Sequence, residues 1–132
     1  MIRAFADTFY FLALLNRQDR VHERAVKFSA SVRQLVTTEW VLTELADGLA
    51  APRHRNMFLQ TRQALLGDGN VQIVPLDGQL YESGIQLYAK RPDKAWSLTD
   101  CISFQVMQQE SLREALTGDH HFEQAGFIAL LR

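Results

Sequence analysis

The chain opens with Ile2-Arg3-Ala4-Phe5-Ala6-Asp7, a short and mainly apolar run that ends at an acid. The run that follows it, Thr8-Phe9-Tyr10-Phe11-Leu12-Ala13-Leu14-Leu15-Asn16, is too long and too rich in leucine to be a second strand. We therefore predict a strand over residues 2–6 and a helix over residues 8–16. A strand followed at once by a helix is the first half of a βα crossover.

The same alternation continues to the end of the chain. Hydrophobic periodicity and turn residues predict further strands at residues 34–37, 71–74, 113–117 and 127–130. They predict further helices at residues 21–32, 38–50, 53–66, 77–90, 97–110 and 120–125. Strands and helices in this order indicate an α/β fold with a mainly parallel central sheet.

Bulk composition narrows the class of protein. The chain has 132 residues, which suits one domain spanning residues 1–132, and its 47% hydrophobic content is ordinary for a globular protein. Cys101 is its only cysteine, so we expect no internal disulfide. No segment has the roughly 18 apolar residues of a membrane span or the apolar stretch of a signal peptide, and we therefore expect a cytoplasmic location. The net charge of −1 means that any RNA must be bound through local basic groups or metal ions.

Two acids follow predicted strands. Asp7 comes directly after the first strand and Asp119 comes after the fourth. Sites in open α/β sheets form beyond the carboxyl ends of the strands, so both carboxylates are candidates for a functional site. Both also precede a predicted helix, where Asp is a favoured cap, and each acid taken alone has capping as an equal alternative.

Asp100 and Glu44 are the other two candidates. Asp100 lies three residues after Ser97, as in a capping box, but its helix is apolar nearly all round, so we expect the helix to be central and the carboxylate partly desolvated. Glu44 lies inside a helix, where capping cannot explain it, and the small Gly48 one turn away leaves room for its carboxylate to point toward the sheet. The alternative is a glutamate at the rim of the helix that reaches solvent.

The four acids together suggest a metal site. Clustered carboxylates raise one another's pKa and destabilise a fold unless a cation neutralises them. Oxygen-only ligands favour Mg²⁺ or Mn²⁺ over zinc. Zinc is also disfavoured by His120 and His121, because adjacent side chains diverge by about 100° on a helix and are not expected to chelate one ion together.

Four motifs resemble those of the PIN-domain family, in particular its VapC-like toxins, in the same order along the whole chain. They are Phe5-Ala6-Asp7-Thr8, Thr37-Thr38-Glu39-Trp40-Val41-Leu42-Thr43-Glu44-Leu45, Ser97-Leu98-Thr99-Asp100-Cys101-Ile102-Ser103-Phe104, and Ala115-Leu116-Thr117-Gly118-Asp119-His120-His121-Phe122. One departure is Gly118, which stands where such domains often carry a bulkier residue and is expected to loosen the Asp119 loop.

This resemblance implies a three-layer α/β/α fold with a central parallel sheet. It also implies a Mg²⁺- or Mn²⁺-dependent endoribonuclease whose catalytic residues and metal ligands are Asp7, Glu44, Asp100 and Asp119. Such toxins often form homodimers and are inhibited by a cognate antitoxin protein. Two alternatives remain: a PIN-fold module that binds RNA or protein without cutting, and a phosphoacceptor receiver domain, which is disfavoured because Asp7 has no acidic neighbour and no lysine follows Lys94.

Overall fold

A computed structural model describes residues 2–132 and contains one five-stranded sheet. The spatial order of the strands is β3-β2-β1-β4-β5, and all four pairings are parallel. The strands are β1 (Ile2–Ala6), β2 (Val32–Thr38), β3 (Val71–Val74), β4 (Glu114–Leu116) and β5 (Ile128–Ala129). The predicted parallel α/β sheet is confirmed.

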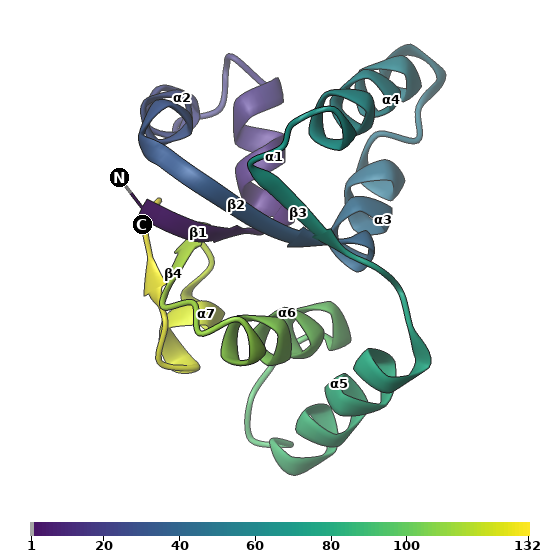
Figure 1. The fold of residues 1–132 in the computed structure, drawn as a ribbon, viewed down its shortest axis with the longest axis vertical. Coiled ribbons are helices and arrows are strands. Elements are labelled where there is room, and N and C mark those ends of the chain that lie inside the picture. The colour runs from purple at the N-terminus through teal and green to yellow at the C-terminus, as the bar shows by residue number, and fades with distance from the viewer. Residues whose placement is uncertain (1) are drawn as a thin grey trace.

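The helices form a layer on each side of this sheet (Figure 1). One layer contains α1 (Thr8–Leu15), α2 (His22–Ser31), α3 (Glu39–Gly48) and α4 (Pro52–Leu66). The other contains α5 (Gly78–Lys90), α6 (Leu98–Gln109) and α7 (His120–Gln124). The three-layer prediction is correct, and the largest displacement of a predicted boundary is two residues, as at β2, which begins at Val32 directly after α2.

The direction of the chain across the sheet reverses beside β1. From β1 the chain moves outward to β2 and β3, and it then crosses to the opposite side of β1 to form β4 and β5. Right-handed crossovers that run in opposite directions place their helices on opposite faces of the sheet, which explains the two layers. A crevice is expected where the carboxyl ends of β1 and β4 meet, and there Ala6 pairs with Leu116.

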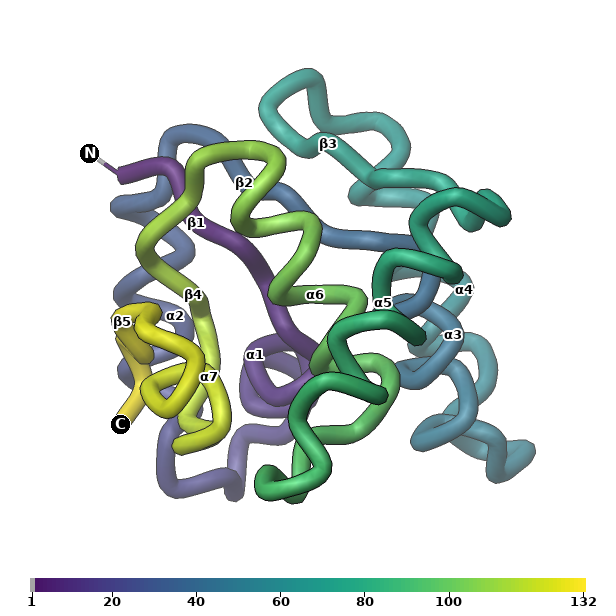
Figure 2. The backbone as a smooth tube through the Cα atoms, turned by 90° about the horizontal axis from the view of Figure 1, so that it is seen from below, coloured from purple at the N-terminus to yellow at the C-terminus, as the bar shows by residue number. Residues whose placement is uncertain are grey.

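Helix α6 fills the centre of the second layer and crosses in front of β1 in Figure 2. Seven of its 12 residues are buried, as expected for a helix that is apolar nearly all round. Helix α5 packs closely on it at Gly84, where a Cβ atom would overlap the side chain of Ile102. This close contact joins α5 to α6 two residues after Asp100. Within residues 2–132, no helix combines the length and the apolarity needed to cross a membrane.

Candidate active site

Asp7 is the innermost of the four acids. It directly follows β1 and is only 7% exposed. Although it occupies the cap position of α1, its side chain makes no capping hydrogen bond; its Oδ2 instead accepts a hydrogen bond of 2.8 Å from the Thr117 hydroxyl. Capping therefore does not explain Asp7, and its carboxylate is directed toward the strand that lies beside β1.

Thr117 connects Asp7 to Asp119. While its hydroxyl donates to Asp7, the same oxygen accepts a hydrogen bond of 3.1 Å from the backbone N–H of Asp119. Asp119 also caps α7, since its Oδ1 accepts a hydrogen bond of 2.9 Å from the backbone N–H of His121. The capping alternative is thus correct for Asp119, and the cap holds its carboxylate near the end of β4.

Asp100 is buried and has the capping role that the sequence suggested. It forms the capping box with Ser97, whose backbone N–H lies 3.1 Å from Asp100 Oδ2. That same oxygen lies 3.1 Å from Nδ1 of His121, which in turn lies 3.4 Å from Oδ1 of Asp119. His121 therefore links the two acids, one at the start of α6 and the other at the start of α7.

Glu44 reaches the site from the first helical layer. The residue is exposed, but its Oε1 accepts a hydrogen bond from the hydroxyl of Thr8, the residue after Asp7. Nothing lies within 4 Å of the position that a Cβ atom of Gly48 would take, so the small size of Gly48 is not what gives the carboxylate its direction. The hydrogen bond from Thr8 orients it. Glu44 is therefore directed toward Asp7 and is not merely a solvent-facing residue at the rim of its helix.

The electrostatics of these groups fit a cation. Burial, with smaller contributions from the charges of Asp100 and Glu44, raises the pKa of Asp7 to about 7, although the hydrogen bond from Thr117 lowers it. Burial likewise raises the pKa of Asp100, with an additional contribution from the Asp119 charge. No lysine or arginine within residues 2–132 forms an ion pair with any of the four acids. A divalent ion with oxygen ligands would supply the missing positive charge.

The sequence profile of the PIN domain matches residues 4–128. The chain belongs to the PIN domain family. A comparison with curated protein sequences gives no match.

Solved structures with the same fold include a toxin. The chain is 25% identical to VapC20 of Mycobacterium tuberculosis, described as a toxin that cleaves the sarcin–ricin loop, with a TM-score of 0.85 over 95% of this chain and 96% of that one. It is 22% identical to a chain of FitAcB from Neisseria gonorrhoeae, with a TM-score of 0.67 over 96% and 94% of the two chains. A chain of DNA-bound VapBC from Salmonella typhimurium is 14% identical, with a TM-score of 0.67 over 98% and 97%. The last two likenesses show the fold alone.

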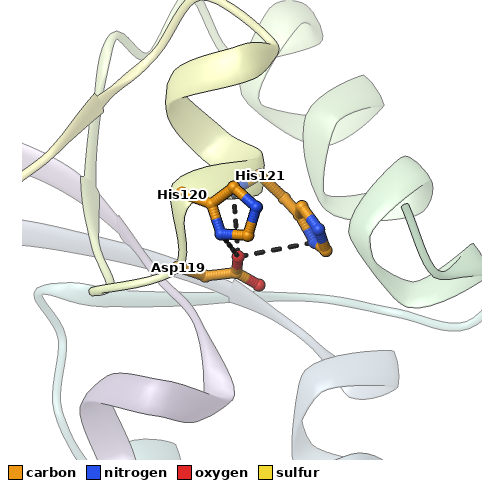
Figure 3. A group of neighbouring side chains, drawn as sticks. All are labelled: Asp119, His120 and His121. Atoms are coloured by element: carbon orange, nitrogen blue, oxygen red, sulfur yellow. Dashed lines mark hydrogen bonds and ion pairs between the residues drawn. The ribbon is translucent and has the colours of Figure 1, made fainter. Parts of the chain in front are cut away.

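The four acids of this PIN domain are not the most compact group of possible metal ligands in the described chain. In the described chain, the group whose candidate ligand atoms all lie within 4.8 Å of one another consists of Asp119, His120 and His121 (Figure 3). The expectation that the two histidines diverge is wrong, because their ring centroids lie 4.4 Å apart. Both residues are in the first turn of a five-residue helix, where their rings fold back toward the capping carboxylate.

Two further features of the site differ from the sequence analysis. His121 was not identified as a link between Asp100 and Asp119, although its position two residues after a capping Asp is a signal that could have suggested it. Gly118 does not loosen its loop, because the ring of Phe9 occupies the space that a Cβ atom would take. The glycine thus permits close packing of α1 against the turn that carries Asp119.

Proposed function

We propose that this PIN domain, residues 1–132, is a divalent-metal-dependent endoribonuclease that hydrolyses RNA phosphodiester bonds. The observation that carries the proposal is the buried carboxylate of Asp7 beside the paired ends of β1 and β4. This carboxylate has two acidic neighbours and no lysine or arginine partner within residues 2–132. An oxygen-rich pocket of this kind favours Mg²⁺ or Mn²⁺.

The roles of the chain's residues follow from their contacts. Asp7, Asp100 and Asp119 would hold the ion, and the Thr117 hydroxyl keeps Asp7 in its orientation. Glu44, held by Thr8, completes the ligand set directly or through water, or orients the attacking water. When bound, the ion acidifies a coordinated water and stabilises negative charge on the scissile phosphate. We therefore assign catalytic and metal-binding roles to these four acids.

We further propose that the chain is the toxin of a VapBC-type toxin–antitoxin pair and acts in the cytoplasm as a homodimer inhibited by its antitoxin. The likeness to VapC20 over nearly the whole of both chains supports the toxin assignment. Helix α4 supports a protein partner, because none of its 15 residues is buried and Leu59 and Leu66 are more than half exposed. An RNA substrate and the free Cys101 thiol are consistent with a cytoplasmic location.

Cleavage of end-labelled RNA tests the nuclease proposal. The purified protein should cut total RNA or transfer RNA with Mg²⁺ or Mn²⁺ and should not cut with chelator. Asp7→Asn and Asp100→Asn should each abolish cleavage while RNA affinity is retained. Asp47→Asn is the matched control, because Asp47 is exposed on the same helix as Glu44. This variant should cut RNA at the wild-type rate.

The competing possibility is a PIN-fold module that binds RNA or protein without cutting. A wild-type protein that binds RNA but never cleaves it with either ion would favour this module and contradict the nuclease proposal. Cleavage that persists in both site variants would instead contradict the assignment of the four acids.

A further inference from the structure

A second group of potential metal ligands lies at the start of α7. Nδ1 of His120 lies 3.7 Å from Oδ1 of Asp119, and Nδ1 of His121 lies 3.4 Å from the same oxygen. Figure 3 shows both rings turned toward this one carboxylate. The proposed nuclease mechanism uses Asp119 but gives neither imidazole a catalytic or metal-binding role. The link from His121 to Asp100 and Asp119 does not account for the turn of His120 toward the same oxygen. The convergence of the two rings therefore requires an explanation of its own.

The four acids Asp7, Glu44, Asp100 and Asp119 are called the acid pocket here. The donor chemistry of the second group differs from theirs. Two imidazole nitrogens and a carboxylate oxygen suit Zn²⁺, Co²⁺ or Ni²⁺ better than Mg²⁺. Ligand atoms at tetrahedral Zn²⁺ lie about 3.3 Å from one another, given bonds of about 2.0 Å. The two nitrogen–oxygen separations of 3.4 and 3.7 Å are close to that value. Asp100 lies outside this group of three, and its Oδ2, 3.1 Å from Nδ1 of His121, helps to hold that ring in place.

The group is open to solvent on one side. The side chain of His120 is 58% exposed, whereas those of Asp119 and His121 are 30% and 19% exposed. An ion can therefore enter past His120 without opening the core. The more buried ligands are already held, because Asp119 caps α7 and His121 contacts Asp100. Such partial preorganisation lowers the cost of assembling the ligands around the ion.

We propose that Asp119, His120 and His121 form a binding site for a zinc-class transition-metal ion, beside the acid pocket and distinct from it in donor chemistry. The two sites share Asp119. Zinc at this site therefore withdraws Asp119 from the acid pocket and inhibits Mg²⁺-dependent cleavage. That inhibition rests on the proposed nuclease function, whereas zinc binding itself does not.

Calorimetric titration of the purified protein with Zn²⁺ alone, with no RNA present, tests the site. One equivalent should bind to the wild type, and Co²⁺ in its place should give the visible absorption of a tetrahedral complex. His120→Ala should weaken binding by about tenfold or more, since even the loss of an outer-shell partner costs about 10- to 100-fold in metal affinity. Because His120 is exposed, this variant should keep the wild-type fold, and its melting temperature in chelator checks that point.

Two variants distinguish the site from other places where zinc can bind. His54→Ala, on α4, removes a distant histidine and should leave zinc affinity unchanged. Asp7→Asn should also leave it unchanged, because Asp7 belongs only to the acid pocket. Equal zinc affinity in His120→Ala and wild type would overturn the proposal, as would loss of binding in Asp7→Asn with retention in His120→Ala. Because the titration needs no RNA, its result is independent of whether the protein proves to be a nuclease.

Discussion

Replacing Asp7 with asparagine should stabilise the metal-free protein at alkaline pH. Folding raises the pKa of this carboxyl from 3.8 to about 7, so the native state disfavours its ionised form. The carboxyl's contribution to stability is therefore fully present below the unfolded-state pKa near 4 and is lost as the pH rises through 7. At about 1.4 kcal/mol per pKa unit, the loss by pH 8 is about 4 kcal/mol at most. Asparagine avoids this loss and keeps an oxygen that can accept the Thr117 hydrogen bond.

Urea unfolding followed by the fluorescence of Trp40 and Trp96 measures the effect. In chelator, the free energy of unfolding of Asp7→Asn should exceed that of the wild type by about 2–4 kcal/mol at pH 8. The difference should shrink toward zero at about pH 3 and below, where the Asp7 carboxyl is neutral in both the folded and the unfolded chain. Asp47→Asn, on the exposed surface, controls for the general effect of removing a negative charge. A variant that is less stable than the wild type at pH 8, or a difference that does not depend on pH, would refute the reasoning.

Three more predictions address the site and its support. Mg²⁺ should raise the melting temperature of the wild type by binding the folded state, and it should do so less in Asp100→Asn; equal shifts in a thermal scan would count against the acid pocket. Thr117→Val should lower the free energy of unfolding by about 1–3 kcal/mol and slow RNA cleavage, because a buried hydrogen-bonding hydroxyl is lost, whereas Thr117→Ser should retain both properties. Gly118→Ala should lower the free energy of unfolding in urea by about 1–3 kcal/mol, because its methyl group would overlap the ring of Phe9. Gly69→Ala, where the space is open, is the control, and an equal loss in both variants would contradict the packing argument.

Local sequence patterns predicted most of the fold, because the spacing of apolar residues shows which side of each element is buried. The apolar character of α6 on nearly every side required a central position, and the helix is central. The opening strand and helix were equally predictable, since an apolar run of five residues and a longer run rich in leucine have different periodicities. The predicted strand ends also placed Asp7 and Asp119 beyond the carboxyl ends of β1 and β4, two strands that pair in the sheet.

The contacts that distinguish the roles of the acids could not be predicted in this way. Whether Asp7 caps its helix depends on Thr117, which is 110 residues away along the chain and reaches it only through the β1–β4 pairing. The arrangement of His120 and His121 was predicted wrongly for a related reason. The angle between adjacent residues describes an ideal helix, whereas these rings pack against a capping carboxylate at the first turn.

The most direct test of the central claim is the location of a bound ion. A crystal of the wild-type protein grown with Mn²⁺ and measured for anomalous scattering should contain a peak bonded to carboxylate oxygens of Asp7 and Asp100, at about 2.0–2.5 Å. No such peak should occur in Asp7→Asn. An ordered Mn²⁺ bonded only to Asp119, His120 and His121, or Mn²⁺-dependent RNA cleavage by a protein with no ion at Asp7, would contradict the assignment of the acid pocket as the catalytic metal site.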